Sequence, residues 1–347
     1  MINTIPTGEL LISAPHRVPC LNLPNSAKES MSLVSPGDIA AVLAAVALAA
    51  LGGEAFLKGV LGVAGWLRMP KLLVATTLAA FATSSPELTV SSVAALSGQP
   101  EIGLGDALGS NVVNIALIFG LALLFGPIKT ERQHIGRDFG LALAAPALTW
   151  MMLSDGNLSR YEGGFLLAMF VVWMLLTIRS ATAQRQPAIP GDAQAGLAST
   201  MAYSIGGLLA LVTAGRLFVS GASNIGAALG LDPYIIGATV VAIGTSLPEL
   251  VTVLLARWRG HDDIGIGTLL GSNLFNGLAI VGIAASLHPI QADMTEVTAA
   301  LFFGIAAVLL TLPNRDGLIS RRRGFMLLAC YGAFVLTTIA AGHGLFF

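Results

Sequence analysis

Two glutamates stand in long apolar stretches of the sequence, and the same short polar motif surrounds both. The motif reads Thr-Ser-x-Pro-Glu-Leu and covers residues 83–88 and 245–250. A carboxylate at bilayer depth is costly, so an ionisable residue there predicts a functional site. In a helix, the Thr and Ser that come four and three residues before the Glu share its face. Glu87 and Glu249 are therefore predicted to act together with neighbouring hydroxyl groups.

A second polar motif follows each glutamate and adds further oxygen donors. It reads Gly-Ser-Asn-x-x-Asn and covers residues 109–114 and 271–276. Its Ser and its second Asn are four residues apart, so they share a helix face. Carboxylate, amide and hydroxyl oxygens without sulfur or imidazole suit Ca²⁺ or Na⁺ rather than Zn²⁺ or Cu²⁺. The candidate ligands in the two copies are Thr83, Ser84, Glu87, Ser110 and Asn114, and Thr245, Ser246, Glu249, Ser272 and Asn276.

The two pairs of motifs belong to an internal duplication. Both motifs recur after 162 residues, so the copies align without a gap. Residues 77–120 and 239–282 are identical at 19 of 44 positions, which is far above chance for apolar sequence. Because the duplicated part holds the rare polar residues of the apolar runs, we expect the two copies to build one site.

The composition is that of a polytopic membrane protein. Of the 347 residues, 55% are hydrophobic and only 11% are charged, and the mean hydropathy is +0.80. Soluble domains have about 25% charged residues. The net charge of −1 argues against a nucleic-acid-binding protein, and the two cysteines, Cys20 and Cys330, supply neither a disulfide framework nor a metal site. We expect no cofactor and no protein partner, only inorganic cations and the lipid bilayer.

The predicted fold is an all-α polytopic membrane protein with ten transmembrane helices in two five-helix repeats. Each apolar run is long enough to cross a bilayer. The predicted spans are 38–57, 72–97, 104–125, 138–154, 160–178, 199–221, 234–257, 264–287, 296–312 and 324–343. The predicted parts are a disordered tail over 1–35, a first repeat over 36–180, a cytoplasmic linker over 181–198 and a second repeat over 199–347.

Five helices is an odd number, so the second repeat must enter the membrane from the opposite side and the repeats are inverted. The distribution of Lys and Arg gives the orientation. With the N-terminus outside, thirteen of them fall in loops on the inner side and three on the outer side. The positive-inside rule then predicts that both termini lie outside the plasma (inner) membrane.

The prolines of the glutamate motifs are predicted to loosen the helices at the site. Pro86 and Pro248 have no N–H, so the carbonyls of Ala82 and Gly244 lose their helical partners. In a membrane such backbone groups are tolerated only when they are buried in protein or line a water-filled cavity. We therefore expect carbonyls at these breaks to face the site.

Five other polar residues have more ordinary interpretations. Asp106 is predicted to open the third helix and to stabilise its N-terminus. Glu54 and Arg216 occupy equivalent positions in the first and sixth helices and are predicted to snorkel or to pair locally. Asn111 and Asn273 have two possible roles, which the sequence leaves open: they form hydrogen bonds between helices, or they support the site.

The two copies resemble the alpha-repeats of the Ca²⁺/cation antiporter superfamily, above all its sodium/calcium exchanger branch. Residues 244–249 match the branch's Gly-Thr-Ser-x-Pro-Glu signature in full, whereas Ala82 replaces the first glycine in the other copy. The resemblance implies a ten-helix inverted-repeat exchanger whose ion ligands fall on the candidate residues above. It also implies ligands from the backbone carbonyls of Ala80 and Ala242.

The resemblance further implies how such a protein works, and one position departs from it. The helices at roughly 38–65 and 199–227 would rock against the rest of the molecule. Some members carry aspartate where this chain has Asn276, so this site has only two carboxylates and its ion stoichiometry stays open.

The charge of the site predicts exchange. Two carboxylates balance one Ca²⁺ or two Na⁺, so the two kinds of ion exclude each other at one midplane site. We predict a secondary antiporter that moves Ca²⁺ against a monovalent cation, namely Na⁺, and not an enzyme. The alternatives are an exchanger of the same fold driven by protons, a cation channel, and an intramembrane enzyme with Ser84 or Ser246 as nucleophile.

Overall fold

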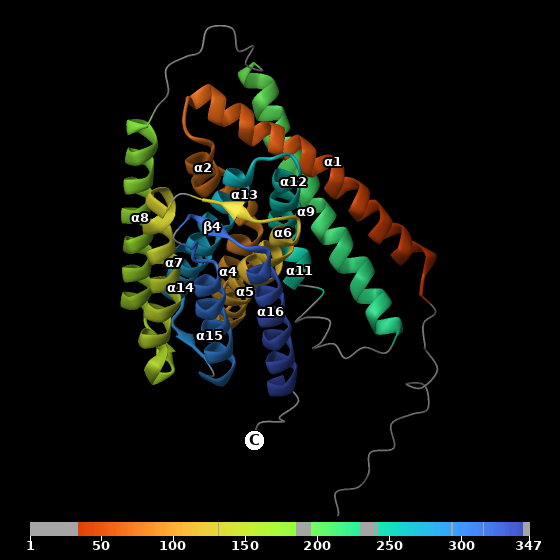
Figure 1. Ribbon diagram of the computed structural model, residues 1–347. Coiled ribbons are helices and arrows are strands. Elements are labelled where there is room, and N and C mark those ends of the chain that lie inside the picture. Colours follow the sequence, from red (N-terminus) through yellow and green to blue (C-terminus); the bar gives the residue numbers. More distant parts are fainter. Residues whose placement is uncertain are drawn as a thin grey trace, which may run out of the picture.

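The computed structural model describes residues 34–130, 132–184, 196–229, 240, 242–292, 294–314 and 316–342, and these are mostly helical (Figure 1). The helices of the first half are α1 (Pro36–Leu67), α2 (Lys71–Val74), the π-helix η2 (Ala75–Ala79), α3 (Ala80–Thr83), α4 (Ser85–Leu96), α5 (Pro100–Val112), the π-helix η3 (Val113–Phe119), α6 (Gly120–Leu124), α7 (Arg132–Met152), the 3₁₀ turn η4 (Leu153–Asp155) and α8 (Arg160–Ala183). Those of the second half are α9 (Leu197–Ala228), α11 (Ala242–Thr245), α12 (Leu247–Trp258), α13 (Asp262–Leu274), the π-helix η6 (Phe275–Ile280), α14 (Val281–Leu287), α15 (Met294–Leu310) and α16 (Arg321–Gly342).

Parts of the predicted organisation lie outside the described residues. They include the tail over 1–35 except for its last two residues, most of the linker over 181–198, and the first residues of the predicted span 234–257. Ser35 is described, and its hydroxyl caps α1 by accepting the N–H of Gly37 at 3.1 Å.

Six helices in the described part of the chain are long and apolar enough to cross a membrane. They are Pro36–Leu67, Pro100–Leu124, Arg160–Ala183, Leu197–Ala228, Asp262–Leu287 and Arg321–Ala340. Lys71–Thr83 and Val297–Leu310 are apolar but shorter. Several apolar runs in one chain make it an integral multi-pass membrane protein.

The two helices that carry the Gly-Ser-Asn-x-x-Asn motifs form the centre of the bundle. The apolar window of Asp262–Leu287 is entirely buried and that of Pro100–Leu124 is 72% buried, whereas the other four windows are 17–28% buried. The outer helices therefore present their apolar side chains to lipid, and the polar motifs lie inside the protein.

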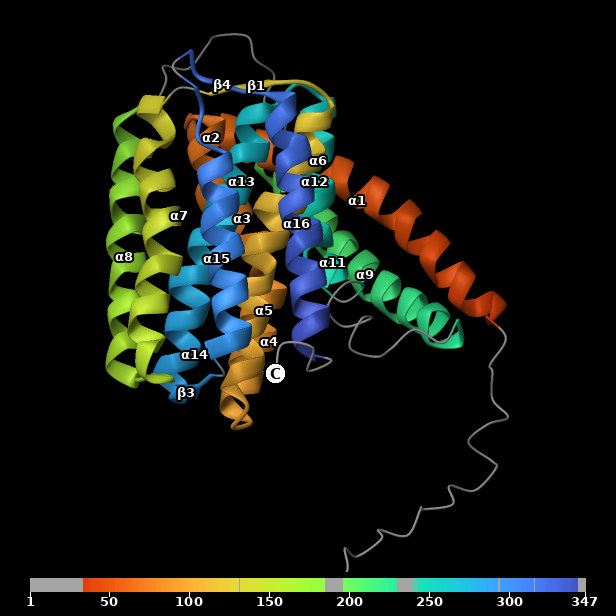
Figure 2. The same cartoon turned by 60° about the horizontal axis from the view of Figure 1, so that its bottom comes forward.

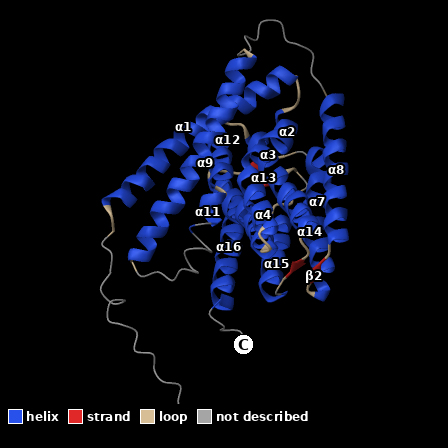
Figure 3. Ribbon diagram, turned by 180° about the vertical axis from the view of Figure 1, so that it is seen from behind, coloured by secondary structure: helices blue, strands red, loops and turns tan. Residues whose placement is uncertain are grey.

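α1 and α9 lie side by side on one flank of the bundle and cross it obliquely (Figure 1), as the view from behind also shows (Figure 3). Each has 32 residues and is about 48 Å long, against about 30 Å for the hydrocarbon core of a bilayer. Glycines let the two helices approach closely, because a Cβ on Gly207 would lie only 2.7 Å from the Cα of Phe56. α1 ends ten residues beyond the predicted end at 57, where Arg68 turns into the left-handed region and Pro70 follows.

The predicted helix over 72–97 is interrupted at Ser84. α3 ends at Thr83 and α4 begins at Ser85, with Ser84 at φ −84° and ψ 5°. Ser246 has nearly the same geometry, φ −84° and ψ 14°, ahead of α12. The Ala82 carbonyl has no helical N–H partner at Pro86, as predicted, and the hydroxyl of Ser85 donates to it instead at 2.7 Å.

In the part of the chain that the structure describes, four two-residue strands that were not predicted from the sequence pair the loops at the two ends of the bundle. β1 (Ile128–Lys129) pairs antiparallel with β4 (Leu318–Ile319), and β2 (Asn157–Leu158) pairs antiparallel with β3 (Ile290–Gln291). α7 runs from β1 toward β2, so the two pairs lie at opposite ends, as Figure 2 shows. We call these the β1–β4 end and the β2–β3 end.

Candidate cation site

Glu249 is buried at the point where the two copies of the motifs meet. Its Oε1 accepts hydrogen bonds from the hydroxyls of Ser84 and Ser272, each at 3.3 Å. Ser84 lies at the break between α3 and α4, whereas Ser272 lies in α13. The fold thus brings together side chains that are 165 positions apart in the chain.

α13 lies against η2 and α3 so closely that position 271 has no room for a side chain. A Cβ on Gly271 would lie 2.5 Å from the Cβ of Ala80. This approach places the hydroxyl oxygens of Thr83 and Ser272 3.4 Å apart in the buried interior. Gly109, at the matching position of the first copy, has open space around it, so the two halves of the site are not packed alike.

Glu87 is as deeply buried as Glu249, but no hydroxyl like those of Ser84 and Ser272 is seen to donate to it in the described part of the chain. Among the described residues no donor reaches Glu87 Oε2, and Glu249 Oε2 and Ser246 Oγ also lack partners. Buried polar groups in native proteins are almost always hydrogen-bonded, and an unpaired buried carboxylate is costly. Buried oxygen atoms without a hydrogen-bond donor have free lone pairs, which a metal cation can use as ligands.

The asparagines link the two central helices. Asn114 donates from Nδ2 to Oδ1 of Asn273 at 3.2 Å, and Asn273 donates from its own Nδ2 to the carbonyl of Asn111 at 3.3 Å. Asn273 therefore makes a bond between helices, one of the two roles left open for it. Asn114 Oδ1 and both polar atoms of the Asn276 side chain have no partner within the described structure, so they stay available as ligands.

The remaining candidates surround this centre. Ser110 is buried on α5, and Ala242 is the first residue of α11. Thr245 is the last residue of α11 and lines a cavity. The carbonyl of Ala80 already accepts the N–H of Ser84 at 2.9 Å and the Thr83 hydroxyl at 3.3 Å.

Three buried polar groups near the site were not among the candidate ligands predicted from the sequence. Thr252 and Thr268 are fully buried, and their hydroxyls find no partner among the described residues. Asp106 Oδ2 is buried in the same way. Because α5 begins at Pro100, Asp106 lies in its second turn, and the prediction that it opens the helix is wrong. The sequence did contain a sign of this placement: Asp106 comes four residues before Ser110 of the Gly-Ser-Asn-x-x-Asn motif, so the two share a helix face.

A cavity of about 500 Å³ lies beside the two helix breaks. α9 forms one wall, and residues next to the motif serines and glutamates form the other, among them Ser85, Pro86, Thr245 and Pro248. Ser85, Pro86, Thr89 and Val90 at the start of α4 line the cavity together with residues at the second break.

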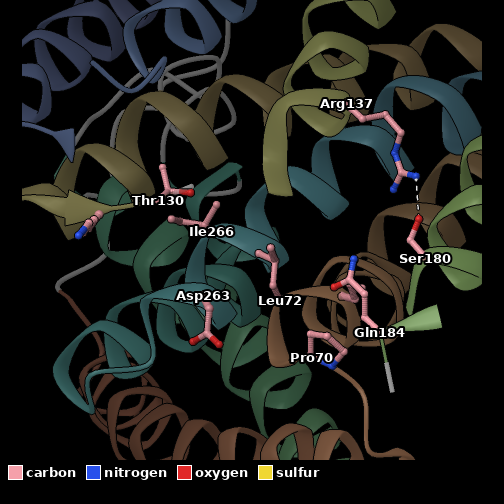
Figure 4. Close-up of a pocket in the computed structure, with 10 residues that line it drawn as sticks. Pro70, Leu72, Thr130, Arg137, Ser180, Gln184, Asp263 and Ile266 are labelled. Carbon is pink, nitrogen blue, oxygen red and sulfur yellow. Dashed lines mark hydrogen bonds between the residues drawn. The ribbon is translucent and has the colours of Figure 1, made fainter. Parts of the chain in front are cut away.

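A second cavity, of about 350 Å³, lies at the β1–β4 end and contains none of the candidate ligands. Figure 4 shows Arg137 and Ser180 on one side of it and Asp263 on the other. Arg137 donates to Thr177 at 2.7 Å and to Asp138 at 3.2 Å. The Arg137 guanidinium is thus paired with groups of the protein itself. With a cationic side chain and no candidate ligand in its lining, this cavity is not part of the candidate cation site.

The sequence profile of the sodium/calcium exchanger protein family matches residues 38–179 and 199–340. The chain belongs to this family. Both matched parts contain one glutamate motif and one Gly-Ser-Asn motif. The family consists of membrane transporters of the Ca²⁺/cation antiporter type rather than enzymes.

Known proteins resemble the chain over most of its length. CaxA of Alkalimonas amylolytica is 31% identical over 78% of this chain and 87% of its own length. The sodium/calcium exchanger MaX1 of Methanosarcina acetivorans is 26% identical over 82% of this chain and 93% of its own. The solved structure of the sodium–calcium exchanger NCX_Mj soaked with Na⁺ and Ca²⁺ is similar with a TM-score of 0.73, 25% identity, and coverage of 89% and 99%.

Proposed function

We propose that this exchanger moves Ca²⁺ in one direction across the membrane and Na⁺ in the other, through a single site between Glu87 and Glu249. The observation that carries the proposal is the arrangement around Glu249. One carboxylate oxygen is fixed by two hydroxyls from different copies of the motif, and the other has no partner in the described structure. A fixed set of oxygen donors is what a hard cation requires.

The ligands that we propose are the side chains predicted from the motifs together with two backbone carbonyls. Glu87 and Glu249 supply the charge, and the hydroxyls and amides complete the shell. The full set is Thr83, Ser84, Glu87, Ser110, Asn114, Thr245, Ser246, Glu249, Ser272 and Asn276, with the carbonyls of Ala80 and Ala242.

We also propose ten membrane spans in two inverted repeats, over 36–180 and 199–347, joined by a linker over 181–198. The pairing of the strands supports this arrangement. β1 and β3 follow the Gly-Ser-Asn helices of the two copies, and each pairs with a strand of the other copy. The two pairs lie at opposite ends of the bundle (Figure 2), as an inverting two-fold axis requires.

Alternating access would come from movement of α1 and α9 against the other helices. The two helices pack on each other through glycines, and α9 borders the cavity beside the site. Movement of this pair would open the site first to one end of the bundle and then to the other. The charge distribution supports an orientation with both termini outside the plasma (inner) membrane.

Uptake of ⁴⁵Ca²⁺ into proteoliposomes tests the proposal. Vesicles loaded with Na⁺ are diluted into Na⁺-free buffer, and a parallel arm carries a pH gradient instead. We expect uptake that follows the Na⁺ gradient and saturates with Ca²⁺. Uptake that follows only the pH gradient would replace Na⁺ by protons as the driving ion, and current without a counter-ion would indicate a channel.

A further inference from the structure

The two halves of the site differ at one position. Asp106 in α5 and Thr268 in α13 are equivalent, because both come four residues before the serine of the Gly-Ser-Asn motif. The first copy therefore has an ionisable carboxyl where the second has a neutral hydroxyl. The family signatures that the chain carries do not include this position.

The packing of α4 on α5 places Asp106 opposite Glu87. The two antiparallel helices approach closely at Ser91, whose hydroxyl donates to the carbonyl of Gly103 at 3.1 Å. Glu87 lies one turn before Ser91, so it faces the turn of α5 that follows Gly103. That turn contains Asp106, and the Glu87 carboxylate is repelled by the carboxylates of Glu249 and Asp106.

No ion pair or side-chain hydrogen bond to Asp106 is found in the part of the chain that the structure describes. Its Oδ2 is buried and has no partner in the described part of the chain, and the same holds for Oε2 of Glu87. Oε2 of Glu249 also lacks a described partner, but its other oxygen, Oε1, accepts hydrogen bonds from Ser84 and Ser272. Two facing carboxylates that each keep a buried oxygen without a partner are unfavourable unless a cation lies between or beside them.

We propose that Asp106 is a third carboxylate of the cation site and binds the ion together with Glu87. This inference rests on the proposed function and deepens it. Asp106, Ser110 and Asn114 are spaced by four residues, so they form one face of α5 that supplies a carboxylate, a hydroxyl and an amide. Asp106 would add a third negative charge to the site, which the neutral asparagines at positions 114 and 276 do not provide.

The position of Asp106 makes the site electrostatically asymmetric. α5 begins at the β2–β3 end and α13 at the β1–β4 end. Asp106 therefore lies toward the β2–β3 end from Ser110, whereas Thr268 lies toward the other end from Ser272. A cation that arrives from the β2–β3 end meets the additional carboxylate.

Thermal unfolding of the purified full-length protein in detergent, with and without Ca²⁺, tests the role of Asp106 independently of transport. Asp106→Asn removes the repulsion from Glu87, so we expect an unchanged or higher Tm without Ca²⁺. The rise in Tm on adding Ca²⁺ should shrink, because stabilisation by a ligand follows its affinity. The half-saturating Ca²⁺ concentration should increase by about tenfold or more, in this titration and in ⁴⁵Ca²⁺ uptake.

Glu101→Gln is the matched control, because Glu101 is an exposed carboxyl in the first turn of the same helix. We expect its Ca²⁺ response to equal that of the wild type. If Asp106→Asn does not fold, Asp106→Thr, which copies the residue of the second repeat, takes its place.

The possible results separate the inference from the proposed function. A variant at Asp106 with the Ca²⁺ response of the wild type overturns the inference and leaves the exchanger intact. A lower Tm combined with that unchanged response would show a purely structural residue, which also overturns it. A wild-type protein that shows neither Ca²⁺-dependent stabilisation nor uptake would refute the proposed function itself.

Discussion

Glu87 and Glu249 occupy matching positions in the two copies but have different partners. Glu249 is fixed by the hydroxyls of Ser84 and Ser272, whereas Glu87 faces other carboxylates. The two hydroxyls fix the position of the Glu249 carboxylate. Glu87 has no such support, so its position should depend more strongly on the cation.

Neutralising either glutamate should abolish Ca²⁺ transport. In Glu87→Gln and Glu249→Gln the site loses a buried charge that faces the ion, and the loss of one partner of a buried charge pair costs about 3–5 kcal/mol. That corresponds to a decrease of about a hundredfold or more in Ca²⁺ affinity. Uptake of ⁴⁵Ca²⁺ over a range of concentrations measures it. Normal transport by both single variants would place the site elsewhere.

Asn276→Asp should strengthen the binding of divalent cations. Asn276 is fully buried, and both polar atoms of its side chain lack partners within the described structure. An added carboxylate should raise Ca²⁺ affinity by about tenfold and lower the Tm measured without cations, because the new charge is then uncompensated. Calcium titration and thermal unfolding measure both effects. An unchanged Ca²⁺ affinity would show that Asn276 does not contact the ion.

At the scale of the elements, the site depends on how closely the helices approach one another. α13 lies against η2 at Gly271, while Gly109 of the first copy is free of such contacts. The sequence shows both glycines in identical motifs and gives no sign of this difference. Only the packing of the folded chain distinguishes them, because the contact joins residues far apart in sequence.

Gly271→Ala and Gly109→Ala form a matched pair that tests the importance of this contact. The methyl group at 271 would meet the backbone of Thr76 and the side chain of Ala80, whereas the one at 109 meets open space. Overpacking costs about 1–3 kcal/mol, so Gly271→Ala should lower the Tm and weaken Ca²⁺ uptake. Gly109→Ala should behave like the wild type. Equal effects of the two substitutions would contradict the close packing at η2.

The sequence predicted that residues of the two motif copies meet in the folded chain, because the proposed ligands come from short repeated motifs, and the contacts of Ser84 and Ser272 with Glu249 confirm that meeting. The breaks at Ser84 and Ser246 were predictable near the prolines, since proline removes a helical N–H. The hydrogen bond from the Ser85 hydroxyl to the Ala82 carbonyl and the position of Asp106 within α5 could not be predicted from the sequence. Both depend on the rotamer of a side chain or on the exact start of a helix, which apolar periodicity does not determine.

At the scale of the whole molecule, one ion pair joins the α1–α9 pair to the rest of the bundle. Glu54 in α1 contacts Arg259, which follows α12, at 2.8 Å, and it also contacts Lys58 in α1 at 3.6 Å. Its sequence interpretation as a locally paired charge holds for Lys58, but the contact with Arg259 joins two elements. If α1 moves during transport, the Glu54–Arg259 contact must break in each cycle.

Arg259→Gln should therefore change the rate of exchange without changing the affinity for Ca²⁺. The pair is partly exposed, and exposed ion pairs contribute about 0–1 kcal/mol, which limits the change in maximal rate to about fivefold. Lys58→Gln is the control, because its contact lies within α1. In ⁴⁵Ca²⁺ uptake, the maximal rate measures the effect on turnover and the half-saturating concentration measures the effect on Ca²⁺ affinity. A change in affinity for Arg259→Gln would show that the pair acts on the site and not on the movement.

The length of α1 and α9 links this exchanger to the lipid around it. Two oblique helices of 32 residues exceed the hydrocarbon thickness of a membrane, and a bilayer responds to such hydrophobic mismatch through the tilt of the helices. Thinner membranes favour a larger tilt and thicker membranes a smaller one. Since these are the helices proposed to move, lipid chain length would bias the conformational equilibrium of the transporter, and turnover would vary with the membrane in which the protein resides.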